Sequence, residues 1–189
     1  MAIGWAIIIG AVVIIFAILF FGYFIAIYNG FVRLRNNIKK SWANINVLLK
    51  QRSDELPKLI SSVKGYMKHE KETLHVLTKA RTDFLKANTM SEKAKADNMI
   101  SSALKTIFAV AENYPNLKAN ENFMQLQGRI SSIENELADR REFYNDSVNQ
   151  FNIRRESFPD SIIAGMMGLK EKEMFKVTAE EMKDVKVEF

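Results

Sequence analysis

The stretch AIGWAIIIGAVVIIFAILFFGYFIAIY, residues 2–28, decides how this chain is organised, because nearly every residue in it is apolar or small. About 20 such residues are enough to cross the roughly 30 Å of hydrocarbon in a bilayer. A cleaved signal peptide would show a basic start, a shorter apolar part and a small-residue cleavage site, and none of these is visible. The stretch therefore predicts an uncleaved transmembrane anchor that begins near Ala2, with Trp5 and Tyr28 towards the two water interfaces.

The charges that follow the anchor predict its orientation. No Asp, Glu, Lys, Arg or His precedes Arg33, and the first acidic residue after the anchor is Asp54. The basic residues nearest to the anchor are Arg33, Arg35, Lys39 and Lys40. Because Lys and Arg are enriched in cytoplasmic loops, we expect the amino terminus outside the cell and the carboxyl-terminal part in the cytoplasm.

Beyond the anchor, apolar residues recur at spacings of three and four, which is the period of an amphipathic helix. The clearest series consists of Phe123, Leu126, Ile130, Ile133, Leu137, Tyr144, Val148 and Phe151. No alternating strand pattern of useful length is present, so the sequence predicts an all-α fold. We expect an anchor at residues 1–30, an antiparallel four-helix bundle of long, coiled-coil-like helices at residues 31–156, and a partly irregular C-terminal segment at residues 157–189.

Three breaks separate the expected helices. The stretch SDELP, residues 53–57, offers Ser53 or Asp54 as a cap and Pro57 in a first turn, which predicts a hairpin. The apolar seam runs through Pro57 almost in phase, so a single kinked helix from the membrane to Phe84 is the alternative. The second break, NTMSEK at residues 88–93, offers Ser91 as a cap.

The third break is YPNLKANENF, residues 114–123, where Pro115 disfavours helical geometry at the residue before it. In a short turn between helices, asparagine side chains cap the free amides and apolar side chains close the end of the bundle. A docking surface for a partner is the alternative, and in an antiparallel layout it would lie far from the bilayer. The residues assigned to this turn are Asn116, Leu117, Asn120, Asn122 and Phe123.

The chain resembles the LemA family. The stretches that carry the resemblance are residues 28–74, Ala80 with Arg81, residues 109–152 (which include YPNLKANENF and RREFYN), FPDSIIAGMMGL at residues 158–169, and the terminal VKVEF. The resemblance covers essentially the whole chain and implies a single membrane anchor followed by a helical bundle. It implies no enzyme activity. Relatives in this family are tied to forming bacterial magnetosome membranes, which suggests a role in membrane organisation.

The composition argues against most reactive sites. The chain has no cysteine, which excludes disulfides, thiolate metal sites and cysteine nucleophiles. A di-iron site in a bundle needs two Glu-x-x-His motifs, and Glu72 with His75 supplies one. Glycine-rich phosphate loops and nucleophile elbows are absent, and the net charge of +5 is too mild to indicate nucleic acid. We therefore expect no catalytic, metal or cofactor site and no small-molecule substrate.

Charged residues in phase with the apolar seams are candidates for buried ion pairs. Glu70 occupies a core position of its helix, and Arg140 lies in phase between Leu137 and Tyr144. A charge inside a bundle needs a partner, although long side chains also reach solvent at the bundle edge. The arginines proposed to pair with Glu70 are Arg52, Arg81, Arg140 and Arg141.

Asn145, Asn149 and Asn152 follow the fourth seam at spacings that place them on one helix face. Hydrogen bonds between helices or subunits are one interpretation of this row, and a solvated face is the other. Residues 158–175 either cover the bundle or lie on the membrane, and the sequence favours neither.

These patterns predict a single-pass protein of the cell membrane whose cytoplasmic bundle is a non-enzymatic scaffold or protein-interaction module. Its expected partners are the lipid bilayer and either a second copy of the chain, as a homo-oligomer, or another membrane protein. An accessory or regulatory subunit of a membrane enzyme or transporter is the alternative.

Overall fold

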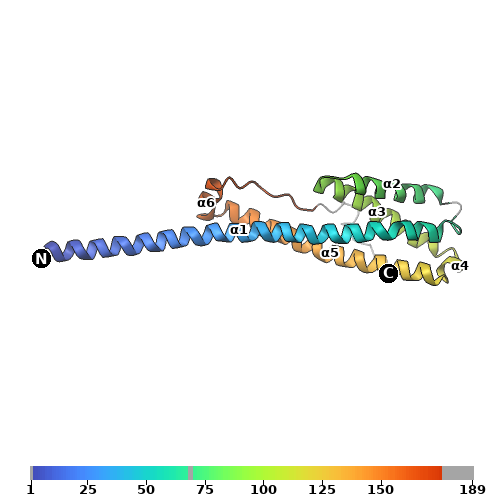
Figure 1. Cartoon of the computed structure of the whole chain (residues 1–189), viewed down its shortest axis with the longest axis horizontal. Coiled ribbons are helices and arrows are strands. Elements are labelled where there is room, and N and C mark those ends of the chain that lie inside the picture. The colour runs from blue at the N-terminus through green and yellow to red at the C-terminus, as the bar shows by residue number, and fades with distance from the viewer. Residues whose placement is uncertain (1, 68–69, 176–189) are drawn as a thin grey trace, which may run out of the picture. The chain divides into compact units, whose positions relative to one another are not determined.

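The computed structural model describes residues 2–67 and 70–175, except for the side chains of Ala2 and Ala6. Every regular element in this part of the chain is a helix (Figure 1). The elements are α1 (Ala2–Val63), α2 (Lys71–Lys86), α3 (Met90–Ala111), α4 (Pro115–Lys118), α5 (Glu121–Glu156) and α6 (Asp160–Met166). The predicted helical class is confirmed, whereas the terminal VKVEF lies outside the described residues.

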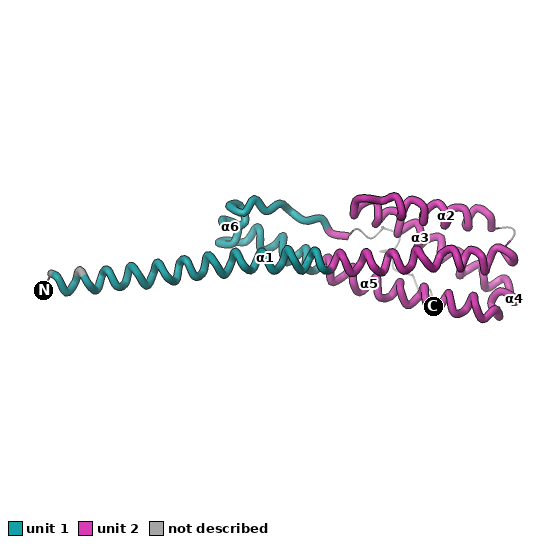
Figure 2. The backbone as a smooth tube through the Cα atoms, in the orientation of Figure 1, with its two compact units in different colours: residues 1–40, 146–173 teal, residues 41–145, 174–189 magenta. Residues whose placement is uncertain are grey.

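The chain divides into two compact units, which Figure 2 distinguishes by colour. Unit 1 contains residues 1–40 and 146–173, and unit 2 contains residues 41–145 and 174–189. Both α1 and α5 contribute to each unit. The domain boundary predicted after residue 30 does not coincide with the end of an element, because α1 continues through it.

α1 is one unbroken helix (Figure 1), so the hairpin predicted at residues 53–57 is wrong. The alternative of a single helix as far as Phe84 is also not what the structure shows, because α1 ends at Val63 and α2 begins at Lys71. The chain turns at residues 64–66, where Gly65 supplies the residue with little helix propensity. Leu59 and Val63, which come after the position of the predicted hairpin, belong to α1 and are buried.

Pro57 inside α1 needs a physical reason, because proline has no amide hydrogen for the carbonyl four residues earlier. That carbonyl belongs to Ser53, which is buried. Arg81, on α2, donates a hydrogen bond from its Nε to this oxygen at 3.0 Å. The guanidinium therefore replaces the bond that Pro57 cannot make, and the helix continues.

A capping box starts α3. Thr89 accepts a hydrogen bond from the Glu92 amide at 3.2 Å, and the Glu92 carboxylate accepts from the Thr89 amide at 3.0 Å. The predicted cap at Ser91 is wrong by two residues, because Ser91 already lies inside the helix. The backbone amides of Thr89 and Asn88 and the Thr89 hydroxyl lower the pKa of Glu92 below its ordinary value near 4.5.

The turn between α3 and α5 contains the short helix α4, with Pro115 at its start. α3 has already ended at Ala111, before the proline. Asn120 caps α5 through its Oδ1, which accepts from the Phe123 amide at 3.1 Å. Leu117 and Phe123 are buried, and the Phe123 ring meets Phe108 edge-on at a centroid distance of 6.3 Å. The predicted roles of capping and of closing this end of the core are both present.

Unit 2 has an apolar core to which the carboxyl-terminal part of α1 and helices α2, α3 and α5 contribute. α2 packs along α3, as Figures 1 and 2 also show. The largest fully buried apolar residues of this core are Ile45, Leu49, Leu56, Leu59, Met67, Leu77, Ile100, Phe123 and Phe175.

Unit 1 contains the amino-terminal part of α1, the end of α5, and α6. The Phe31 ring on α1 meets the Phe151 ring on α5 edge-on at 5.9 Å. α5 is connected to α6 through a cis peptide bond between Phe158 and Pro159. α6 ends at Met166, and Gly168, two residues later, has a φ of +62°, the left-handed conformation that favours glycine after a helix.

Candidate functional site

Among the residues that the structure describes, the most buried ionic group surrounds Asp97 in α3, which is 0% exposed. Its carboxylate forms ion pairs with Arg52 of α1 and with Arg141 of α5. Arg52, which is 1% exposed, also pairs with Glu134 of α5 and donates to the Ser101 hydroxyl at 2.9 Å. This ionic cluster, Arg52, Asp97, Glu134 and Arg141, joins three helices of unit 2.

The ionic cluster combines two guanidinium groups with two carboxylates, so its formal charge is zero. Removing a charge from water costs several kcal/mol, and attraction inside the protein offsets that cost only when every member is paired. Such a group adds little net stability compared with apolar residues of the same volume. It does penalise any sliding of α1, α3 or α5, because a one-residue shift would separate the pairs. The cluster is consistent with a structural role.

Sequence reasoning placed the buried acid on the wrong residue. Glu70 is half-buried and accepts a hydrogen bond from the Tyr114 hydroxyl at 3.0 Å, and it pairs with no arginine in the described part of the chain. This hydrogen bond, burial and the negative charge of Glu70 raise the pKa of Tyr114 above its ordinary value of 10.0. Asp97 was missed, although it continues the seam of Ile100 and Leu104 backwards by three residues.

The other arginines proposed as partners of Glu70 have different surroundings. Arg140 is exposed and pairs with Glu136 at 3.2 Å, whereas its neighbour Arg141 is buried. A helix of 3.6 residues per turn drifts against a strict heptad, which explains why the buried position is one residue further along. Arg81 is bound to the Ser53 carbonyl, as described above.

Phe175 is the last described residue of the C-terminal segment, and it is buried in unit 2. Its ring lies 6.1 Å from the Trp42 ring and 5.0 Å from the Arg141 guanidinium carbon. Asn145 binds the Phe175 backbone twice, accepting from its amide at 2.7 Å and donating to its carbonyl at 3.1 Å. Tyr144 is buried beside Trp42 and donates to the Met90 sulfur at 3.2 Å.

The asparagine row thus binds main chain at two of its three positions. In unit 1, Asn152 accepts from the Lys172 amide at 2.9 Å and donates to the Lys172 carbonyl at 2.9 Å. Asn149 is exposed. The amides bind a segment of the same chain, an arrangement that the spacing of the asparagines did not predict.

At the turn around α4, two predicted docking residues, Asn116 and Asn122, are exposed. Asn122 also lines a hollow between the end of the α1 helix and the start of α5. The residues lining this hollow are Lys58, Ser61, Ser62, Asn120, Asn122, Gln125, Leu126 and Arg129. Its walls are mainly amide, hydroxyl and basic groups, which suit hydrogen bonding to a polar partner.

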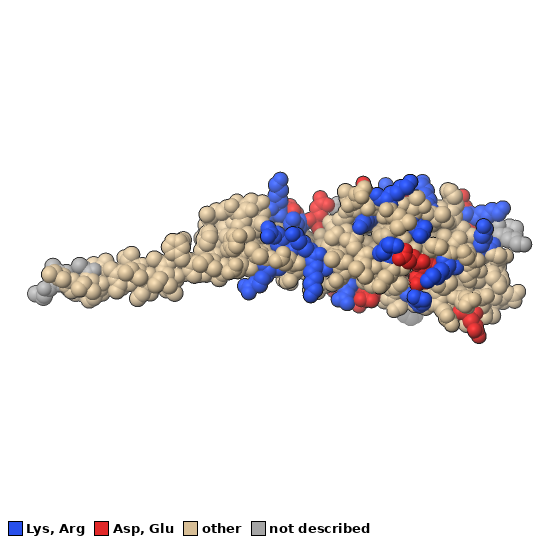
Figure 3. Space-filling model, in the orientation of Figure 1, with Lys and Arg blue, Asp and Glu red and all other residues tan. Residues whose placement is uncertain are grey.

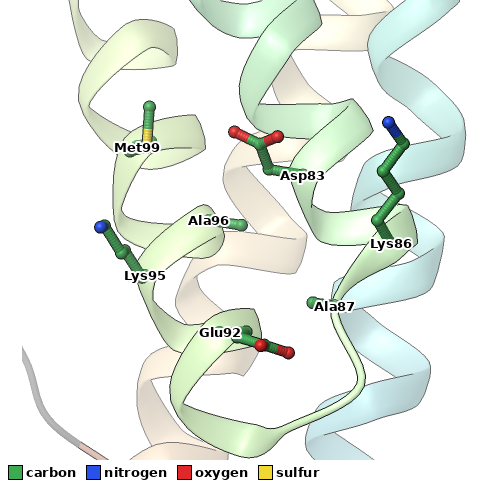
Figure 4. A pocket seen from close by; sticks show the side chains of 7 residues that line it. All are labelled: Asp83, Lys86, Ala87, Glu92, Lys95, Ala96 and Met99. Atoms are coloured by element: carbon green, nitrogen blue, oxygen red, sulfur yellow. The ribbon is translucent and has the colours of Figure 1, made fainter.

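A second hollow lies between α2 and α3, and Figure 4 shows the seven side chains that line it. Lys86 and Lys95 point in different directions rather than towards a common centre. Glu92, which also lines it, already forms the capping box. The described residues contain no group of three His, Cys, Asp or Glu side chains that could hold a metal ion.

The residues predicted beside the anchor lie in unit 1. Arg33, Arg35, Lys39 and Lys40 are all exposed on α1. In the view of Figure 3, the apolar amino-terminal part of α1 shows no charged side chain. Lys and Arg side chains gather beyond the end of this apolar part. Trp5 and Tyr28 are exposed, as is nearly every other described side chain of this apolar part.

Among the described residues, α1 is the one helix that is long and apolar enough to cross a membrane by length and composition. The most apolar 18-residue window of α1 has a mean hydropathy of 2.9, and none of it is buried inside the structure. The class defined by this arrangement is an all-helical protein with one long, apolar amino-terminal helix.

The chain belongs to the LemA family, which it matches over residues 41–189. It is 30% identical to protein LemA of Metamycoplasma hominis over 181 residues, which cover 91% of this chain and 81% of that protein. It is also similar to magnetosome protein MamQ 2 of Paramagnetospirillum magneticum, at 30% identity over 43% of this chain and 30% of that protein. Magnetosome protein MamQ of Magnetospirillum gryphiswaldense is 26% identical over 42% of this chain and 29% of that protein.

Proposed function

We propose that this protein is a single-span membrane protein whose cytoplasmic part is a non-enzymatic scaffold that binds copies of itself. The observation that carries the proposal is the apolar run of α1, residues 2–28, which is exposed throughout most of its length yet belongs to a helix that reaches the core of unit 2. An apolar surface of this size is unfavourable in water and favourable in hydrocarbon.

Electrostatics supports the proposed orientation. Four exposed basic residues, Arg33, Arg35, Lys39 and Lys40, follow the apolar run, and no acid precedes Asp54. A cytoplasmic position for these residues agrees with the distribution of Lys and Arg around membrane helices. We also propose that the carboxyl-terminal part of α1 and helices α2, α3 and α5 of unit 2 form an antiparallel four-helix bundle.

The hydrogen bonding of two carboxylates, one buried and one exposed, supports a role other than catalysis. The buried carboxylate of Asp97 is engaged by two arginines, and Glu92 is engaged by two backbone amides. The printed names of the MamQ relatives connect them with the magnetosome, and this likeness supports a role in organising membranes.

Orientation is tested with a single cysteine, which is clean because the chain contains none. Ser102 is exposed on α3 and is a suitable site for Ser102→Cys. We expect a membrane-impermeant thiol reagent to label this variant only after the cells are made permeable. Labelling in intact cells, or recovery of the full chain from the soluble fraction, would contradict the proposal.

Self-association is tested by crosslinking in native membranes, followed by affinity capture and mass spectrometry. A scaffold that binds itself gives a ladder of homo-oligomers. One dominant band that contains a single foreign membrane protein would contradict it and would favour an accessory subunit of a membrane enzyme or transporter.

A further inference from the structure

α6 has two faces of different exposure. Ile163 and Ala164 are buried in unit 1, whereas Ile162 is 57% and Met166 72% exposed. Residues four apart lie on the same face of a helix, so Ile162 and Met166 form one apolar surface. Phe158, in the turn that begins α6, is 83% exposed. A seven-residue helix thus presents its large apolar side chains on both sides, which is unfavourable for a segment surrounded by water.

Arg154 fixes the beginning of α6 to the end of the apolar run of α1. Its guanidinium forms an ion pair with Asp160, the first residue of α6, and lies over the Phe31 ring at 5.3 Å. It also lies against Gly30, where an added Cβ would overlap with it. Gly30 is two residues beyond Tyr28, which is about 3 Å along a helix axis. The start of α6 is therefore held where the apolar run ends.

Positive charge accompanies the exposed apolar side chains in the same unit. Arg33, Arg35, Lys39 and Lys40 are exposed on α1. Lys170 and Lys172 after α6 alternate with the exposed acids Glu171 and Glu173, so the excess of positive charge comes from α1. An apolar face beside Lys and Arg side chains is the composition of helices that lie in the headgroup region of an anionic membrane.

We propose that Phe158, Ile162 and Met166 form a lipid-contact surface, which inserts into the headgroup region of the leaflet where the anchor leaves the membrane. The occupant is the anionic bilayer itself, because Arg154 holds the start of α6 beside the end of the apolar run, and four exposed basic residues of α1 follow that run in the same unit. This inference rests on the proposed anchoring of α1. α6 would then act as a second membrane contact, in addition to the apolar run of α1. Two contacts restrict how far unit 1 can tilt relative to the membrane.

The test uses single-cysteine variants of the full-length protein in vesicles of phosphatidylcholine and phosphatidylglycerol. Ile162→Cys and Met166→Cys carry an environment-sensitive fluorophore, and the vesicles contain bromine-bearing lipids as quenchers. Ser102→Cys, exposed on α3, is the control in water, and Ile14→Cys, within the apolar run, is the control in hydrocarbon. We expect the labels at 162 and 166 to be quenched several-fold more than the label at 102, at a depth of about 5–10 Å below the headgroup surface.

The controls separate the two proposals. A deep label at 14 together with labels at 162 and 166 that behave like 102 would overturn the lipid contact and leave the anchor intact. A label at 14 without quenching would overturn the anchoring, and the lipid contact with it. The labels at 162 and 166 could also be as shielded from water in lipid-free, dimeric protein as they are in vesicles. That result would overturn the lipid contact in favour of a contact with a second copy of the chain.

A charge at the surface gives an independent measurement. Ile162→Asp in the Met166→Cys background should shift the emission at 166 towards that of water, because a carboxylate is disfavoured among acyl chains. The matched change Lys105→Asp, on an exposed position of α3, should leave the emission at 166 unchanged. Unchanged emission in the Ile162→Asp protein would contradict the proposal.

Discussion

The two units of this protein treat charge and apolar surface in opposite ways. Unit 2 encloses a neutral cluster of arginines and carboxylates within an apolar core, and its residue Asp97 has no exposure. Unit 1 carries an apolar run with almost complete exposure, and the four basic residues that follow this run on α1 are exposed as well. Under the proposed anchoring of α1, unit 2 would lie in water and unit 1 at the boundary between water and lipid.

The largest expected effect comes from Asp97→Asn, which removes the charge that pairs with Arg52 and Arg141. Breaking a buried pair from one side typically costs about 3–5 kcal/mol, because it leaves uncompensated charge in the interior. Chemical unfolding in detergent, followed by circular dichroism, measures the loss. Asp139→Asn, an exposed position on α5, is the control and should change the unfolding free energy by less than about 0.5 kcal/mol. Equal stability of the two variants would contradict the assignment.

A smaller effect is expected from Arg81→Met, which leaves the buried Ser53 carbonyl without its donor. An unsatisfied buried acceptor costs about 1–3 kcal/mol. Pro57→Ala supplies a backbone amide to the same carbonyl, so Arg81→Met should cost less in the Pro57→Ala background than in the native chain. A double-mutant cycle measures this coupling, and strictly additive free energies would show that Arg81 does not compensate for the proline.

In unit 1, Gly30→Ala should destabilise the protein by about 1 kcal/mol, the lower end of the range for added volume in a packed region, because Arg154 can shift. Gly128→Ala, on α5 with no neighbouring atoms within 4 Å, should instead stabilise it by about 0.5–1 kcal/mol through helix propensity. Hydrogen exchange of α6 amides reports the local effect. Effects of the same sign at both glycines would contradict the close approach of Arg154.

The smallest effect concerns pH. Because folding lowers the pKa of Glu92, its capping contribution is complete above the ordinary value of 4.5 and is lost as the pH falls through the lower, folded value. Glu92→Gln should therefore lose less stability than the native chain between neutral pH and this acidic range. Unfolding curves of the native chain and of Glu92→Gln at both pH values measure this difference. Identical pH dependence of the two proteins would show that the Glu92 cap does not contribute to the loss of stability in acid.

The helical class could be predicted from the sequence, because periodicity and an apolar run are local signals. So could the cap at Asn120 and the closure of the core by Leu117 and Phe123. The continuation of α1 through Pro57 could not, because the compensating donor, Arg81, lies far along the chain. A proline is therefore a reliable break only where no distant side chain replaces its missing hydrogen bond.

The candidate site shows the same limit. Arg52 and Arg141 were correctly suspected of lying inside, but Glu70 was chosen over Asp97 as the buried acid. Both acids follow an apolar seam, and only packing distinguishes the one that meets arginines from the one that meets a tyrosine. The burial of Phe175 had no local signal, because its partners come from α1 and α5.

The way in which two asparagines hold the C-terminal segment affects how this chain can change during evolution. Both hydrogen bonds between Asn152 and Lys172 use main-chain atoms of Lys172, so any side chain except proline at position 172 leaves them intact. Asn145 also forms hydrogen bonds with main-chain atoms, those of Phe175, but the Phe175 ring in addition packs beside Trp42. The bonds to Asn145 and Asn152 consequently place no demand on the side chain at position 172, whereas the packing beside Trp42 places a demand on shape at position 175.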